Sequence, residues 1–310
     1  MENKALILFG PTSAGKTAAS ILLAKELGTG IISADSMQLY RLMDIGTGKP
    51  SPDELREVPH HLINAAWPHE QWSAGRFVSE ASHIMEALAA AGKVPLIVGG
   101  TGLYMKALTR GLMGAPSADE SLRNELLSRE ADLYGMLTEM DPETARLLAP
   151  SDTRRIIRAI EVQIKTKHAI SELKRDLTAP LPYDFIKIGL TRDRAELYAL
   201  IEERVDRMLS EGLVREVENV LAQEPPPSRT AMQAIGYKEI EGYLKGLYAY
   251  GEAVRLIKRN TRRYAKRQFT WFKKEENTVW VDVTGLKEGK EIYGKVKKAL
   301  IAARPELFPA

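Results

Sequence analysis

Eight residues near the start of the sequence have the types and spacing of a phosphate-binding loop. They match the pattern G-x-x-x-x-G-K-[ST] at every required position, and they are Gly10, Pro11, Thr12, Ser13, Ala14, Gly15, Lys16 and Thr17. In such a loop, successive backbone N–H groups and the N-terminus of the following helix face one anion. Lys16 adds a mobile positive charge, and the Thr17 hydroxyl is placed to hold a magnesium ion. The motif predicts phosphate binding but leaves the phosphate compound open.

The segments on either side of the loop supply the elements that must position it. An unbroken apolar run over residues 5–9 precedes the loop, which is typical of a strand buried in a parallel sheet. An apolar helix is expected to follow the loop and to end at Gly28. Further strands are predicted, with helices between them, over residues 30–36, 94–98, 185–190 and 279–283. We therefore expect an α/β fold with a parallel sheet flanked by helices.

A carboxylate, Asp35, stands at the end of the second predicted strand. The carboxyl ends of parallel strands form the ligand crevice of such sheets, so Asp35 is expected to face the same site as the phosphate loop. An aspartate that only caps a turn or a helix fits the sequence equally well. The sequence alone leaves both interpretations open.

The strand over residues 94–98 ends in Gly99-Gly100-Thr101-Gly102 and not in an acidic residue. A P-loop ATPase normally supplies an aspartate for magnesium near such a strand end, so ordinary ATP hydrolysis is disfavoured. Three glycines around Thr101 predict a backbone that a substrate approaches closely.

A helical segment is predicted inside the sheet domain. Between residues 114 and 183 no strand-like run occurs, and apolar residues recur at helical spacing after a capping box at Ser117–Glu120. We therefore expect a discontinuous α/β core, residues 1–114 and 184–310, and a helical insertion domain, residues 115–183.

Basic residues gather late in the chain. Residues 255–274 contain nine basic residues and no acidic one, on a segment with apolar residues at helical spacing. A solvated helix face is one interpretation, but contact with a polyanion is favoured. Arg204 and Arg207, near the end of an earlier predicted helix, are candidates for a phosphate contact. His60 and His61 are interpreted as a structural pair, because no further metal ligands stand at suitable spacing.

Composition excludes several classes of protein. The 310 residues include no cysteine, which excludes disulfides, cysteine-ligated zinc and thiol chemistry. No apolar run approaches the roughly 18 residues of a membrane span, and no signal peptide precedes the first strand, so a cytoplasmic protein is expected. The net charge of +3 is modest, so any nucleic-acid contact must use a local patch. Nothing in the sequence calls for more than a monomer.

Seven motifs in this order resemble those of bacterial tRNA dimethylallyltransferases, also called isopentenyl-diphosphate:tRNA transferases. They cover residues 10–17, 34–40, 44–47, 98–104, 154–162, 233–239 and 261–272. The resemblance spans nearly the whole chain. It implies a P-loop fold that holds dimethylallyl diphosphate and transfers the prenyl group to N6 of the adenosine 3′-adjacent to the anticodon. It also implies that the helical insertion binds the anticodon stem-loop.

The chemistry of this transfer suggests roles for individual residues, and the resemblance implies which residues contact tRNA. Asp35 is expected to be the general base, with Lys16 and Thr101 also catalytic, while Arg204 and a Mg²⁺ on Thr17 stabilise the leaving diphosphate. The expected tRNA contacts are Asp35, Ser36, Met37, Gln38, Thr101, Arg123, Ala159, Ile160, Glu161, Val162 and Gln163.

Two rival functions share the phosphate loop. A small-molecule kinase would use it to hold ATP, and so would a nucleic-acid-stimulated ATPase. Both require an acceptor site or an ATP-coupled site that the sequence does not display. The absence of an acidic residue after residues 94–98 also disfavours both.

Overall fold

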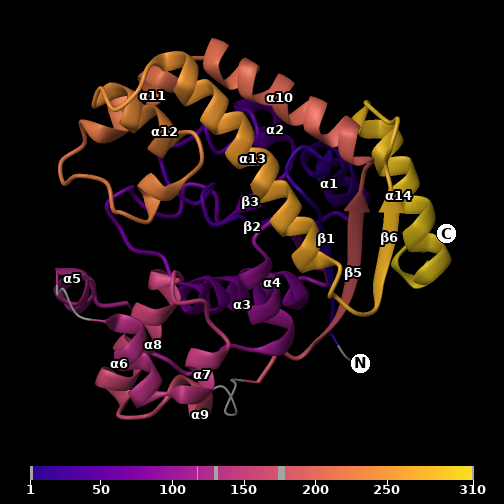
Figure 1. The fold of residues 1–310 in the computed structure, drawn as a ribbon. Coiled ribbons are helices and arrows are strands. Elements are labelled where there is room, and N and C mark those ends of the chain that lie inside the picture. The colour runs from indigo at the N-terminus through magenta and orange to yellow at the C-terminus, as the bar shows by residue number, and fades with distance from the viewer. Residues whose placement is uncertain (1–2, 117, 129–131, 174–178, 309–310) are drawn as a thin grey trace. The chain divides into compact units, whose positions relative to one another are not determined.

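The computed structural model describes residues 3–116, 118–128, 132–173 and 179–308, and Ser117 of the expected capping box lies outside them. The chain divides into two compact units. One unit contains Met1–Met105 and Pro182–Ala310, and the other contains Lys106–Leu181. Figure 1 labels the elements of both units.

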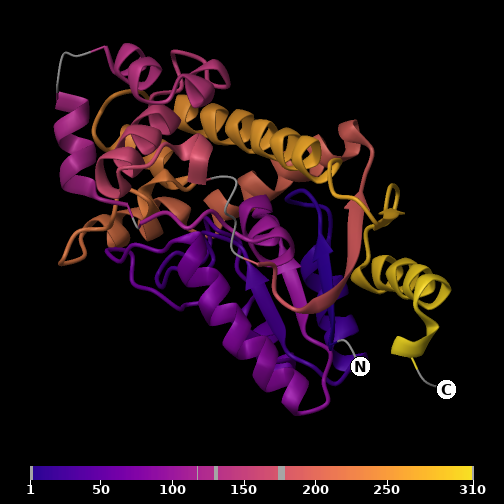
Figure 2. The same cartoon turned by 90° about the horizontal axis from the view of Figure 1, so that it is seen from below.

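The described residues of the first unit form a six-stranded sheet in the order β3-β2-β4-β1-β5-β6, with every neighbouring pair parallel. Figure 2 shows several of these strands side by side. The sheet confirms the predicted α/β fold, although the short edge strand β3 was not predicted. The strands are β1 (Asn3–Phe9), β2 (Ile31–Ala34), β3 (His60–His61), β4 (Leu96–Gly99), β5 (Tyr183–Thr191) and β6 (Thr278–Asp282).

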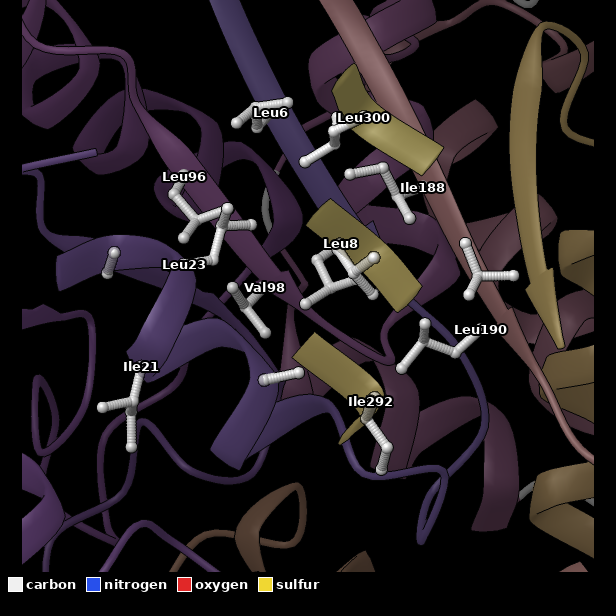
Figure 3. Packing of buried hydrophobic residues seen from close by; sticks show 14 of the residues in the cluster. Leu6, Leu8, Ile21, Leu23, Leu96, Val98, Ile188, Leu190, Ile292 and Leu300 are labelled. Carbon is white, nitrogen blue, oxygen red and sulfur yellow. The ribbon is translucent and has the colours of Figure 1, made fainter. Parts of the chain in front are cut away.

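Successive residues of β1 point to opposite faces of the sheet and so anchor two layers of helices. Leu8 packs in one cluster with Ile188 of β5 and with Ile292 of α14 (Gly289–Ala303), beside α1 (Lys16–Glu26), as Figure 3 shows. Phe9 faces the other way, and its ring lies 4.7 Å from that of Phe272, centroid to centroid. Phe272 is the last residue of α13 (Tyr250–Phe272).

A second apolar cluster lies at the other end of α13. It joins the segment after β2, represented by Leu39 and Met43, to the later helices through Val205 and Tyr237. This cluster fixes the loop over residues 41–49 against helices far away in sequence. The remaining helices of the unit are α2 (Pro52–Glu57), α3 (Ala74–Ala90), α10 (Arg194–Ser210), α11 (Leu213–Leu221) and α12 (Tyr237–Leu244), with short 3₁₀ helices at Ala231–Gln233 and Pro305–Leu307.

The regular elements in the described residues of the second unit are helices. Helix α4 (Gly102–Arg110) crosses the boundary between the units. The helix with the most buried residues is α8 (Thr153–Thr166), where Ile156 and Ile160 join a cluster with Leu126 and Leu137. The other helices are α5 (Glu120–Ser128), α6 (Leu133–Met140), α7 (Pro142–Arg146) and α9 (Ile170–Leu173).

Candidate active site

The phosphate loop connects β1 to α1 and has the conformation that its sequence predicts. Gly15 is the N-cap of α1 with a left-handed φ of 93°, and a Cβ there would come within 2.4 Å of the Ile292 side chain. Ser13 also has a positive φ, of 63°. No side chain caps α1. The backbone N–H groups of its first turn are therefore left for an anion, whose charge the positive end of the helix dipole favours.

Lys16 bends back over the loop that contains it. Its ammonium group donates to the carbonyl oxygens of Gly10 at 2.9 Å and Pro11 at 2.8 Å. Burial and the positive charge of Arg204 lower the pKa of Lys16 to about 8, although the charge of Asp35 acts in the opposite direction. Two cations and one carboxylate therefore share this end of the sheet.

Arg204 comes from α10 and is the second cation of the site. Its guanidinium lies against Gly48, where an added Cβ would come within 1.8 Å of Nη2. Burial lowers the pKa of Arg204, and Asp35 counteracts this. Arg207, the other candidate for a phosphate contact, is mostly exposed, and its Nε lies 3.8 Å from Glu211 Oε1. The structure therefore brings only Arg204 to the phosphate loop.

Asp35 lies just beyond β2 and makes two kinds of interaction. Its Oδ1 accepts from the backbone N–H of Met37 at 2.9 Å and of Gln38 at 3.3 Å, so it stabilises a turn. Its Oδ2 has no donor among the described residues. The Asp35 charge acts on the pKa values of Lys16 and Arg204, which places the carboxylate beside the phosphate loop. The turn interpretation therefore applies to Oδ1, and a role of this aspartate in the site stays a prediction.

Thr101 joins the ends of two neighbouring strands. Its Oγ1 accepts from the Ser36 backbone N–H at 3.0 Å, and its own N–H donates to the Ala34 carbonyl at 3.2 Å. Thr101 is thus hydrogen-bonded to the segment that contains residues 35–38. Met37 also packs against the second apolar cluster, and Gln38 Nε2 donates to the Gly48 carbonyl at 3.1 Å.

The glycines around Thr101 pack closely against other parts of the same chain. A Cβ on Gly99 would lie 2.2 Å from the Ala34 carbonyl oxygen, and one on Gly102 would lie 2.4 Å from the Trp271 ring. Gly100 is similarly close to the Gln268 side chain. Contacts with strand β2 and helix α13 of the same chain therefore explain why these positions are glycine, and the approach of a substrate to their backbone stays a prediction.

Two residues of α13 complete the site and were missed from the sequence. Gln268 is buried and bridges Thr12 N–H at 2.9 Å to the Gly100 carbonyl at 3.0 Å. Tyr264 lies one helical turn earlier, where burial and the nearby charge of Asp35 raise its pKa. Their spacing of four residues places both on one helix face. In the sequence, this pair at a spacing of four residues does not stand out among the many basic residues around it.

Oxygen atoms suited to magnesium are present beside the loop. Thr17 lines a small cavity together with Ser33 and Gln38, and hydroxyl and carbonyl oxygens are ligands that Mg²⁺ accepts. The buried Ser13 hydroxyl has no hydrogen-bond partner among the described residues. Within those residues, no group of three or more histidine, cysteine, aspartate or glutamate residues forms a metal cage. These protein oxygens therefore fit a Mg²⁺ ion whose remaining ligands are phosphate oxygens and water.

The remaining predicted tRNA contacts lie in the helical unit. Arg123 donates to both carboxylate oxygens of Glu161, at 3.1 and 2.8 Å, and Arg158 donates to the same carboxylate at 2.6 Å. Burial alone would raise the pKa of Glu161, but these hydrogen bonds outweigh it and lower the pKa. Among the predicted contacts, Ala159, Ile160 and Val162 have apolar side chains that are buried in the core of the unit.

Gln163 follows these buried residues and is only partly covered. Its Oε1 is buried and has no hydrogen-bond partner among the described residues. The groups of this region that reach the surface include the guanidinium groups of Arg123 on α5 and Arg158 on α8. Each of these side chains is about one third exposed.

The basic segment of α13 is less positive than its sequence indicates. Glu252, Asp206 and Glu202 form ion pairs with three of its members, which are Arg255, Lys258 and Arg262. Two of these acidic partners belong to α10, so the charges within residues 255–274 alone could not reveal these ion pairs. The exposed basic residues of its second half are Arg263, Lys266, Arg267, Lys273 and Lys274.

The two histidines occupy the edge strand β3. The Nδ1 atom of His60 lies 2.9 Å from the Val58 carbonyl oxygen, and the His61 ring packs against Gly30. Burial lowers the pKa of both rings. These contacts agree with the structural pair that the sequence favours. Among the helices in the described part of the chain, none has the length and apolarity to cross a membrane.

Known proteins are similar to this chain over nearly its whole length. Residues 38–275 match the IPP transferase family, and residues 3–66 match an isopentenyl transferase family. The tRNA dimethylallyltransferase of Thermodesulfovibrio yellowstonii is 49% identical over 97% of this chain and 98% of its own. That of Thermotoga maritima is 43% identical over 96% of this chain and 98% of its own.

Solved structures agree with these sequence matches. The tRNA isopentenylpyrophosphate transferase of Bacillus halodurans has a TM-score of 0.71 and 38% identity, covering 98% of this chain and 99% of its own. A eukaryotic dimethylallyltransferase acting on tRNA has a TM-score of 0.81 and 27% identity, covering 98% of this chain and 79% of its own. The chain therefore belongs to the IPP transferase family of tRNA dimethylallyltransferases.

Proposed function

We propose that the protein transfers the dimethylallyl group of dimethylallyl diphosphate to N6 of the adenosine on the 3′ side of the anticodon in tRNA. One observation supports this most directly. A phosphate loop and a carboxylate with one free oxygen lie beside each other in a chain that belongs to the tRNA dimethylallyltransferase family.

The phosphate loop is assigned to the diphosphate. The backbone N–H groups of Ser13 and of Gly15 to Thr17 and the ammonium of Lys16 would bind it, and Arg204 would approach from α10. Lys16 can exchange its two carbonyl partners for phosphate oxygens without leaving the loop. The Thr17 hydroxyl would hold Mg²⁺, and an ion there would neutralise part of the diphosphate charge. These groups stabilise the charge that develops on the diphosphate as it leaves.

Asp35 and its neighbours are assigned to the adenosine. The free Oδ2 accepts a hydrogen bond from the N6 amine and finally its proton. The C–O bond to the diphosphate breaks, the bond between N6 and the prenyl carbon forms, and the N6 proton passes to Asp35. Thr101 holds Ser36 and thereby the position of the adjacent carboxylate. The base must leave its stack to reach this site, which costs a few kcal/mol that contacts of residues 35–38 offset.

We assign the anticodon stem-loop to the helical unit. Arg123 and Arg158 present guanidinium groups that suit phosphate oxygens. Glu161 fixes these groups, and the apolar residues Ala159, Ile160 and Val162 anchor the helix that contains it, with Gln163 as a further contact. Since one chain supplies every site residue, a monomer is sufficient. Because tRNA is the acceptor, we assign the reaction to the cytoplasm.

A label-transfer experiment tests this function. The protein is incubated with an anticodon stem-loop RNA and either dimethylallyl diphosphate labelled in the prenyl group or ATP labelled in the γ-phosphate. Prenyl label is expected in the RNA, at the adenosine next to the anticodon. A stem-loop with guanosine at that position is the matched control and should remain unlabelled, since it lacks the N6 amine. Phosphate label on any acceptor would instead favour the kinase.

A further inference from the structure

The carboxylate of Glu216, on α11, binds three consecutive backbone amides of a distant loop. Its Oε2 accepts from Asp44 N–H at 2.9 Å and Ile45 N–H at 2.7 Å, and its Oε1 accepts from Gly46 N–H at 2.9 Å. The hydroxyl of Tyr237 also donates to Oε1. One side chain thus determines the conformation of a loop about 170 residues earlier in the chain.

The side chains packed around this carboxylate hold the loop of residues 44–46 tightly in place. A Cβ on Gly46 would come within 2.4 Å of the Tyr237 ring and 2.8 Å of Leu213. Tyr237 and Leu213 are fully buried in the second apolar cluster. Burial, and then the charge of Glu216, raise the pKa of Tyr237, so its hydroxyl keeps the proton that it donates.

The other end of the same loop contacts the active site. The Gly48 carbonyl accepts from Gln38 Nε2 at 3.1 Å, and Arg204 Nη2 lies 3.5 Å from the Thr47 carbonyl. Gly48 has a φ of 60° and leaves no room for a Cβ beside the Arg204 guanidinium. A shift of this loop would therefore move a proposed diphosphate contact and a proposed acceptor contact together.

We infer that Glu216 is a positioning residue for prenyl transfer, which acts through residues 44–48 on Arg204 and Gln38. The inference rests on the proposed function, because it assumes that Arg204 binds the diphosphate. Glu216 lies behind the loop and is not assigned any contact with substrate. Its carboxylate supplies acceptors for all three amides, and an amide side chain cannot do so because one of its two ends is a donor.

The test measures the affinity of the intact protein for inorganic diphosphate by calorimetry. Glu216→Gln should weaken binding about tenfold, the effect of losing roughly one hydrogen bond to a charged group. The exposed Glu218, two residues along the same helix, provides the matched control, and Glu218→Gln should leave the affinity unchanged. Unchanged affinity in Glu216→Gln would overturn the inference.

A double-mutant comparison separates positioning from general destabilisation. In an Arg204→Ala background, Glu216→Gln should cause little further loss of diphosphate affinity, because the group that it positions is absent. An equal loss in both backgrounds would show that Glu216 does not act through Arg204. If Glu216→Gln does not fold, Tyr237→Phe removes one donor to the same carboxylate and is compared in the same two backgrounds. The calorimetric measurement contains no RNA and follows no prenyl transfer, so failure here is distinct from failure of the label-transfer experiment.

Discussion

The side-chain oxygen of Gln268 accepts a hydrogen bond from the Thr12 backbone N–H at 2.9 Å. The same amide group donates to the Gly100 carbonyl at 3.0 Å and is buried. The conformation of the phosphate loop therefore depends on a helix more than 250 residues later in the chain.

Gln268→Ala should loosen the phosphate loop. Both Thr12 N–H and the buried Gly100 carbonyl lose their partner, so we expect the free energy of unfolding to fall by about 1–3 kcal/mol. The KM for dimethylallyl diphosphate should rise as well. Chemical denaturation and steady-state kinetics measure the two effects. Thr270→Ala, at an exposed position on the same helix, is the control. An unchanged KM in Gln268→Ala would contradict this role.

Asp35→Asn should separate the two functions of this side chain. The asparagine oxygen can still accept from the Met37 and Gln38 amides, so the turn and substrate binding are preserved. Loss of the general base should lower kcat by about 10²–10⁴-fold. Rapid-quench kinetics with saturating stem-loop RNA measure the chemical step. Asp35→Ala also loses the turn, so it should bind RNA more weakly than Asp35→Asn. Near-normal turnover in Asp35→Asn would remove Asp35 from the mechanism.

The sequence predicted the sheet and the phosphate loop well, because both depend on local patterns. Residues 10–17 occur together in one strand-loop-helix unit, and buried strands form continuous apolar runs. The edge strand β3 was missed because two histidines show no apolar alternation. Gln268 and Glu216 were missed for another reason. Each has an ordinary residue type, and its importance comes from contacts with loops that only the tertiary fold brings near.

The glycines of 99–102 illustrate the same limit. Their number suggested that a substrate approaches this strand end, but the sequence could not show that the chain packs against these glycines itself. The Ala34 backbone and the Trp271 ring fill the space in the structure. Similarly, the acid-free run on α13 predicted a strongly positive face, but Glu202 and Asp206 of α10 pair with part of it.

The lowered pKa of Lys16 predicts how the affinity for dimethylallyl diphosphate changes with pH. Its pKa of about 8 in the folded protein lies below its ordinary value of 10.5, so Lys16 loses its proton as the pH rises above 8. The affinity for dimethylallyl diphosphate should therefore fall between about pH 8 and pH 10, since an uncharged amine binds phosphate poorly. Calorimetry over this range measures the affinity. Lys16→Ala is the control and should bind weakly with little pH dependence.

The lowered pKa of Lys16 also affects the free energy of unfolding, which should rise with pH where the affinity for dimethylallyl diphosphate falls. Between pH 8 and 10.5 the unfolded chain holds a proton that the folded protein has released, so this group makes the free energy of unfolding rise with pH. The contribution is complete above the ordinary pKa and is lost as the pH falls through 8. In denaturation experiments, the free energy of unfolding of wild type minus that of Lys16→Ala should rise across this window, since Lys49, whose pKa burial also lowers, contributes to both proteins. An equal rise in both proteins would assign it to another group.

The exposed half of the basic segment on α13 should contribute to tRNA binding through charge alone. Replacing Arg263, Lys266 and Arg267 with alanine should weaken binding and flatten the plot of log affinity against log salt concentration by about 2 units, since each lost phosphate contact removes somewhat less than one unit of slope. Filter binding of the whole tRNA over a salt series measures this. Arg255→Ala with Lys258→Ala is the matched control, because Glu252 and Asp206 already pair with these two residues. If the triple variant keeps the wild-type slope, this part of α13 is only a solvated helix face.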